Sequence, residues 1–226
     1  MTLQVVLRGS DGVVIASDTL VSSQPKEMIV TDSNSKMMVK SRFVCTFAGD
    51  DCAKYIAMTM VAKAGDSGLE NPIQFITNVN EALKDYKTKS GCFPKTQYRK
   101  ILWVQALDCS EIAIWAASYW ALNENFELIA PGHKLGSIFA GDEGNPARYF
   151  VEHYFKKNPV KPVSGLKKMA AHVIRTGHLF NPAGVHELEM VVGENGGFIK
   201  LRPDDLQPID NAISGIHAAI DAYFVV

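Results

Sequence analysis

The sequence contains no apolar run of the roughly 18 residues needed to span a bilayer. It also has no apolar leader, because Arg8 and Asp11 interrupt the first residues, and we expect no signal peptide. Neither sign of charge is in excess: the net charge is −1 and the sequence pI is about 6.6. No global field therefore favours nucleic acid or an anionic membrane. We expect a cytoplasmic protein that binds neither.

Several motifs of cofactor and metal chemistry are missing as well. There is no G-x-G-x-x-G, P-loop, G-x-S-x-G or H-E-x-x-H string. The six histidines are scattered, and no two of them have the spacing of metal ligands. No CxxC pair occurs, and we expect the four cysteines to be reduced core thiols rather than disulfides or metal ligands. They are Cys45, Cys52, Cys92 and Cys109. We expect no metal and no cofactor.

The 226 residues, 47% of them hydrophobic, are enough for one domain with a full core, and we find no linker, repeat or low-complexity segment. We expect a single domain over residues 1–226. Apolar patterns predict three groups of strands separated by pairs of helices, with a helix at the end. The expected strands cover 3–7, 13–16, 37–39, 43–48, 101–107, 112–118, 138–140, 187–192 and 197–201. Expected helices begin near Asp50, Asn71 and Asn145, another carries the apolar stripe from Leu166 to Ile174, and the last covers 208–223.

This order of elements predicts the fold class. The turn residues 10–12 and the pair Asn195-Gly196 indicate hairpins, and hairpins give antiparallel sheets. Hairpins separated by helix pairs suit two packed sheets with helices outside, rather than alternating βαβ units. We therefore predict an α+β protein, a four-layer αββα sandwich of two antiparallel sheets flanked by helices.

The opening MTLQVVLRGSDGVVIASDT places Thr2 directly before a strand. Methionine is removed most readily before a small residue, and we expect the mature chain to begin with threonine. Such a residue carries a hydroxyl and a free α-amine, whose ordinary pKa of about 8 suits a general base at neutral pH. The amine can accept the proton of the hydroxyl directly or through one water, so a single residue supplies nucleophile and base.

The sequence offers partners for this device. Asp18 ends the second strand of the first hairpin, across from the beginning of the first strand. Lys36 immediately precedes another short apolar strand. Gly49 lies where a strand turns into a buried helix, where free N–H groups and the helix dipole favour negative charge.

At these residues the sequence resembles the proteasome β-subunit family of N-terminal nucleophile hydrolases. The resemblance rests on Thr2 and Asp18 with fifteen residues between them, on the strand GVVIASDT, on Lys36-Met37 and on FAG before a helix. It extends over almost the whole chain through the order of elements, and the start MT is most similar to the HslV-type bacterial proteasome homologues.

The resemblance implies a role for each of these positions. Thr2 would be the nucleophile, Lys36 the ammonium that lowers the proton affinity of its hydroxyl and amine, Asp18 the carboxylate that orients the lysine, and the Gly49 amide the oxyanion donor. Substrate-binding positions would follow by the same resemblance: Val21 and Ser22 pairing with an extended peptide, Phe47 as the floor of a shallow pocket for small or medium apolar side chains, and Asp51 beside them.

Two segments depart from the family pattern. Where the family has G-S-G after a strand, this chain has AGDEGNP, which puts Asp142 or Glu143 near the terminal amine. A carboxylate there would hold the amine protonated and weaken it as a base. Asn181 is the stand-in for a family aspartate or serine farther along.

The resemblance implies a threonine endopeptidase subunit of a stacked double ring of 12 or 14 copies. It would cleave unfolded polypeptides or peptides, with an ATP-dependent unfoldase as a possible partner. The alternative is an inactive ring or scaffold subunit that binds peptides by strand addition; a small-amide amidase with a terminal nucleophile is a third possibility. Simpler interpretations of the residues also stand: an inert Thr2, a turn aspartate at 18, a solvated Lys36, a Gly49 that only relieves a turn, and a core Phe47.

Overall fold

The first hairpin forms as its turn residues predict. β1 (Leu3–Arg8) pairs antiparallel with β2 (Val13–Asp18), with Gln4 opposite Ser17. The turn is closed by the Gly9 amide, which donates to the Gly12 carbonyl at 2.9 Å.

The computed structural model describes residues 2–19, 35–49, 51–65, 71, 74, 77–78, 81, 100–108, 111–120, 125–129, 136–141, 146–157, 161–180 and 187–224.

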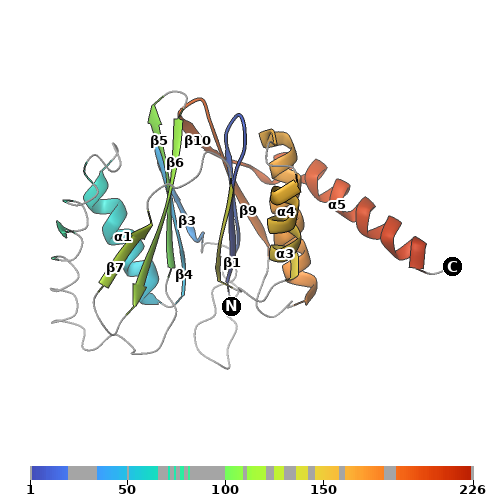
Figure 1. Ribbon diagram of the computed structural model, residues 1–226, viewed down its shortest axis with the longest axis horizontal. Coiled ribbons are helices and arrows are strands. Elements are labelled where there is room, and N and C mark those ends of the chain that lie inside the picture. The colour runs from blue at the N-terminus through green and yellow to red at the C-terminus, as the bar shows by residue number, and fades with distance from the viewer. Residues whose placement is uncertain are drawn as a thin grey trace.

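Two five-stranded sheets contain these strands, and every strand pair is antiparallel (Figure 1). Sheet 1 has the order β10 (Gly197–Lys200), β9 (Leu188–Glu194), β2, β1, β8 (Gly136–Gly141). Sheet 2 has the order β3 (Met37–Val39), β4 (Phe43–Ala48), β5 (Lys100–Asp108), β6 (Glu111–Trp120), β7 (Asn125–Ile129). The predicted α+β class with two antiparallel sheets is confirmed.

The described helices are α1 (Asp51–Ala64), α3 (Pro146–Lys157), α4 (Val163–Phe180) and α5 (Pro203–Phe224). Alternation along the strands sends side chains to both faces of each sheet. Val6, Ile15 and Val191 of sheet 1 pack with Val44 and Leu102 of sheet 2 in one buried cluster. The opposite faces pack against the helices, with α4 on sheet 1 and α1 on sheet 2.

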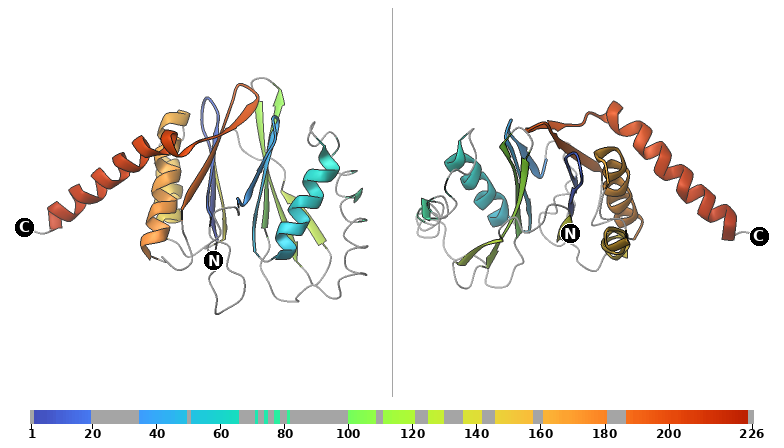
Figure 2. Two further views of the ribbon diagram at one scale, coloured as in Figure 1. Left: turned by 180° about the vertical axis from the view of Figure 1, so that it is seen from behind. Right: turned by 45° about the horizontal axis from the view of Figure 1, so that its top comes forward.

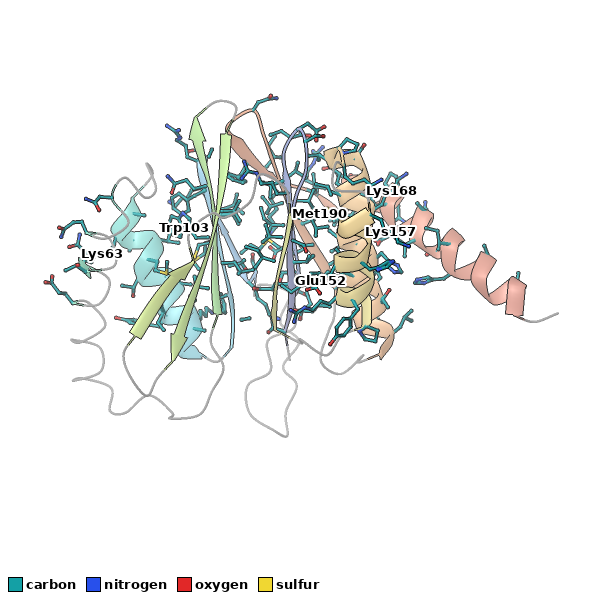
Figure 3. All side chains as sticks on the ribbon, in the orientation of Figure 1. Lys63, Trp103, Glu152, Lys157, Lys168 and Met190 are labelled. Atoms are coloured by element: carbon teal, nitrogen blue, oxygen red, sulfur yellow. The ribbon has the colours of Figure 1, made fainter. Side chains whose placement is uncertain are left out.

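The helix-facing clusters are visible in the side-chain view. Figure 3 shows Trp103 in sheet 2 and Met190 on the α4 side of sheet 1. The Phe43 and Trp103 rings stack with their centroids 4.2 Å apart and their planes at 14°. Cys45, in the same cluster, is a buried free thiol, and burial raises its pKa. The prediction of a reduced core thiol is confirmed for Cys45; the side chains of the other three cysteines lie outside the described residues.

A turn and a helix cap that the local sequence predicts are present in the structure. Asn195 and Gly196 have φ angles of 51° and 75°, as the hairpin turn between β9 and β10 requires. The second predicted helix lies largely outside the described residues. Its N-cap is described, because the Asn71 side-chain oxygen accepts a hydrogen bond from the Gln74 amide at 3.2 Å.

One predicted element boundary is wrong, and one strand is not predicted. The final helix begins at Pro203 rather than Pro208, because Pro203 occupies the first helical position and the Asp205 carboxylate accepts from the Arg202 amide at 3.0 Å. The strand β7 was not expected from the sequence at all. It pairs with the end of β6 and extends sheet 2 at its edge.

The last helix is buried against the body through its first half, and His217 farther along contacts the ring of His172 in α4. Leu206, Ile209 and Ile213 are buried against the cluster that contains α4. Arg175 of α4 binds Asp210 through two hydrogen bonds of 2.9 and 2.7 Å. Farther along, α5 projects away from the rest of the chain in every view (Figure 2). Within the described part of the chain, no helix combines the length and apolar character needed to cross a membrane.

Candidate active site

The structure places Lys36 in contact with both Asp18 and Thr2. The β1–β2 register sets Asp18 beside Leu3, and the Asp18 Oδ1 atom accepts a hydrogen bond from the Leu3 amide at 2.7 Å. The Lys36 Nζ atom lies 2.7 Å from Asp18 Oδ2 and 3.1 Å from Thr2 Oγ1. One carboxylate therefore holds both the residue next to Thr2 and the ammonium that faces the Thr2 hydroxyl.

The interior position of this group determines its electrostatics. Asp18 is fully buried, Lys36 is 2% exposed, and Thr2 is partly exposed at the end of β1. Burial lowers the pKa of Lys36 from its ordinary value, and the Asp18 carboxylate, followed by that of Glu189, opposes this by favouring the charged ammonium. In its charged form Lys36 donates to Thr2 Oγ1, which lowers the proton affinity of that hydroxyl. The arrangement can therefore activate a hydroxyl nucleophile.

Gly49 occupies a backbone conformation that suits glycine. It follows β4 and precedes α1, and its φ angle is 133°. An L-residue with a Cβ rarely adopts this region of φ. The position at a sheet-to-helix junction agrees with the predicted turn, and its role as an oxyanion donor stays a prediction.

The other predicted residues are placed as follows. Phe47 is 6% exposed and packs in the cluster beneath α1, so its interpretation as a core residue holds, and its role as a pocket floor stays a prediction. Asp51 opens α1, and its side chain is outside the described set. The remaining candidates lie outside the described residues: Val21, Ser22, Asp142, Glu143 and Asn181.

Sequence reasoning missed a group of polar side chains between the sheets near this site. Gln4, Ser17 and Glu189 occupy adjacent register positions on β1, β2 and β9, and all three are buried. Gln4 Nε2 reaches across to the Phe47 carbonyl of sheet 2 at 2.6 Å. The sequence contained a signal for Glu189, because it is the one charged residue in the apolar stretch LEMVV. Its neighbours Leu188 and Met190 face the helices, so Glu189 faces the other sheet. Among the described residues, no three His, Cys, Asp or Glu side chains gather as metal ligands would.

No protein-family model and no curated protein matches the sequence. Solved structures match over nearly the whole chain. Anbu (ancestral beta-subunit) from Yersinia bercovieri has a TM-score of 0.70 and 12% identity, with 100% of this chain and 97% of that chain covered. Anbu from Hyphomicrobium sp. strain MC1 has a TM-score of 0.66 and 13% identity, with coverage of 99% and 97%. A Gly-1 mutant of Anbu from that strain has a TM-score of 0.64 and 13% identity, with coverage of 100% and 97%.

These matches establish the fold of the chain. It is α+β with two antiparallel sheets, consistent with a proteasome-like fold. The structures of Anbu are among those that share it, with a sequence identity so low that the likeness concerns the fold alone.

Replacing Asp18 with asparagine should strongly destabilise the protein, because it leaves the buried Lys36 ammonium without its closest carboxylate. Breaking a buried pair on one side costs about 3–5 kcal/mol. Equilibrium urea unfolding measures the loss. The control is Glu152→Gln, which breaks the partly exposed Arg148–Glu152 pair of α3 and should change stability by no more than about 0.5 kcal/mol. Equal losses in the two variants would contradict a buried, tightly coupled pair.

Replacing Gly49 with alanine should destabilise the fold by about 1–3 kcal/mol, because alanine is strained at this φ angle. The matched control is Gly215→Ala in α5, where an added Cβ has no neighbour within 4 Å. That change should raise stability by as much as about 1 kcal/mol through helix propensity. Thermal unfolding of both variants gives the comparison, and a Gly49→Ala protein as stable as the parent would refute the strain argument.

Proposed function

We propose that the chain is an N-terminal threonine peptidase that hydrolyses peptide bonds of unfolded polypeptides or peptides. The observation that carries the proposal is the contact of Lys36 Nζ with Thr2 Oγ1 at 3.1 Å, with Asp18 2.7 Å behind the ammonium. The mechanism requires removal of Met1, since only a free α-amine on Thr2 can accept a proton.

The reaction begins with attack of Thr2 Oγ on the scissile carbonyl carbon. As the new C–O bond forms, the hydroxyl proton passes to the α-amine of Thr2, directly or through one water. The charged Lys36 stabilises the oxygen as it loses this proton. When the tetrahedral intermediate collapses, the C–N bond breaks and the α-ammonium returns the proton to the leaving nitrogen. Water then hydrolyses the ester by the same route.

The oxyanion of the intermediate would be held by the Gly49 amide, because that N–H group belongs to the junction from which α1 begins. The substrate would lie extended along Val21 and Ser22 and be paired as an added strand. Phe47 would close the bottom of the pocket for the side chain before the cleaved bond, with Asp51 nearby. No metal or organic cofactor takes part in this chemistry.

The finer structural proposals follow from the same family resemblance. The two sheets and their helices would form a four-layer αββα sandwich of the N-terminal nucleophile hydrolase type. Copies of the chain would assemble into a stacked double ring of 12 or 14 subunits in the cytoplasm, with the sites facing an enclosed chamber and an ATP-dependent unfoldase as partner. The proteasome-like fold shared with the Anbu structures supports this assembly at the level of the fold.

Incubation with a peptide epoxyketone should add the full mass of the inhibitor to the Thr2-containing peptide. The hydroxyl attacks the ketone and the α-amine opens the epoxide, so both groups of one residue are captured without a leaving group. Thr2→Ala should give no adduct. Lys36→Met should slow adduct formation by about 10²-fold or more, because the hydroxyl loses its ammonium. Mass analysis of the intact and digested protein provides the measurement.

Thr59→Ala is the matched control, since this α1 threonine donates to the Tyr55 carbonyl within its own helix and should leave the adduct rate unchanged. An adduct in the Thr2→Ala protein would eliminate the threonine mechanism. Intact Met1 and no adduct in the parent protein would instead support a scaffold subunit that lacks activity.

A further inference from the structure

Three side chains form a polar cluster beside Lys36 that the mechanism above does not use. Glu189 of β9 is 5% exposed, and its Oε1 atom accepts hydrogen bonds from Ser35 Oγ and from Lys200 Nζ. Ser35 directly precedes Lys36 along the chain and is exposed. Its hydroxyl also accepts from the Met37 amide at 3.2 Å. The backbone on both sides of Lys36 is therefore tied, through Ser35, to Glu189.

The cluster joins the two sheets. Glu189 and Lys200 belong to sheet 1, whereas Ser35 leads into β3 at the edge of sheet 2. The same edges are linked by the Phe198 amide, which donates to the Ser41 carbonyl at 3.3 Å. Since Lys36 must reach from sheet 2 to Asp18 and Thr2 on sheet 1, whatever fixes these edges also fixes the position of its ammonium.

Glu189 lies on β9, the strand next to β2, which carries Asp18. Its register partner on β2 is Ser17, the residue before Asp18. Val191, two residues farther along β9, packs between the two sheets. Because alternate residues of a strand face the same side, the Glu189 side chain also points into the space between the sheets. Its Oε2 atom is buried and accepts no hydrogen bond from the described residues. The carboxylate also acts on Lys36 through its field, which favours the charged ammonium.

We propose that Glu189 is a positioning residue of the site: with Ser35 and Lys200 it fixes the Lys36 segment across the sheet edges and supplies the ammonium with a second carboxylate. The inference rests on the proposed function, in which Lys36 must be charged. The charged groups of this region alternate in sign as Asp18, Lys36, Glu189 and Lys200, contributed by β2, the segment before β3, β9 and β10. The effect of Glu189 on the pKa of Lys36 is upward, against the effect of burial.

The test measures the titration of Lys36 by NMR of the full chain labelled with ¹³C at the lysine Cε atoms, with Lys36→Arg used for assignment. Glu189→Gln preserves the shape of the side chain and its acceptor oxygen but removes the charge. The Lys36 midpoint should fall in this variant, because the carboxylate that favours the charged ammonium is gone. In the epoxyketone reaction, the loss of rate on the alkaline side should move to lower pH by a similar amount, because the charged ammonium is lost earlier.

Lys200→Gln provides the second variant and has a half-exposed parent side chain. It removes the cation that competes for Glu189, so the Lys36 midpoint should rise. A purely structural clamp would loosen in both variants and move the midpoint in the same direction. Glu194→Gln, at the exposed end of the same strand, is the charge-matched control and should leave the midpoint unchanged.

Equal Lys36 midpoints in Glu189→Gln and the parent, or shifts of the same sign in Glu189→Gln and Lys200→Gln, would overturn the inference. If Glu189→Gln fails to fold, the Lys200→Gln protein decides alone. An unchanged or lowered Lys36 midpoint in that variant would also overturn the inference. The titration is independent of catalysis. A parent protein without any epoxyketone adduct would therefore remove the proposed function while the NMR result still decides the role of Glu189.

Discussion

The buried ion pair between Asp18 and Lys36 is the interaction on which the site depends. Its two members come from different sheets, and one carboxylate oxygen is shared with the backbone of β1 while the other binds the ammonium. A buried pair repays its desolvation only when the geometry is good and the remaining polar atoms are satisfied. Here the same contacts that satisfy the pair also place the ammonium on the Thr2 hydroxyl, so the stability of the pair and the proposed chemistry depend on one set of hydrogen bonds.

Much of the fold could be predicted because its signals are local. The residues 10–12 and the pair Asn195-Gly196 specify tight turns, and a tight turn makes the two apolar strands beside it pair with each other. The hairpin between β1 and β2 also fixed the candidate site in part, because its register brings the end of β2 next to the beginning of β1. Asp18 and Thr2 could therefore be associated from spacing, and Lys36 joined them through the family resemblance.

The features that sequence reasoning missed depend on contacts between distant segments. Glu189 meets Ser35 and Lys200 only because β9, β10 and the start of β3 are brought together when the sheets pack. No local sequence pattern predicts these contacts of Glu189. The edge strand β7 has its only described strand partner in β6, and edge positions carry weak patterns. The sequence predicts a start of α5 at Pro208, whereas the groups that cap the helix are Arg202 and Asp205, one turn earlier.

The most direct test of the central claim is a double-mutant cycle of Asp18→Asn and Lys36→Met by equilibrium unfolding. If the two groups form one buried unit, the double variant should be destabilised by less than the sum of the single variants, with a coupling of about 0.5–3 kcal/mol. Losses that simply add would show that carboxylate and ammonium act independently, and the account of the site would fall.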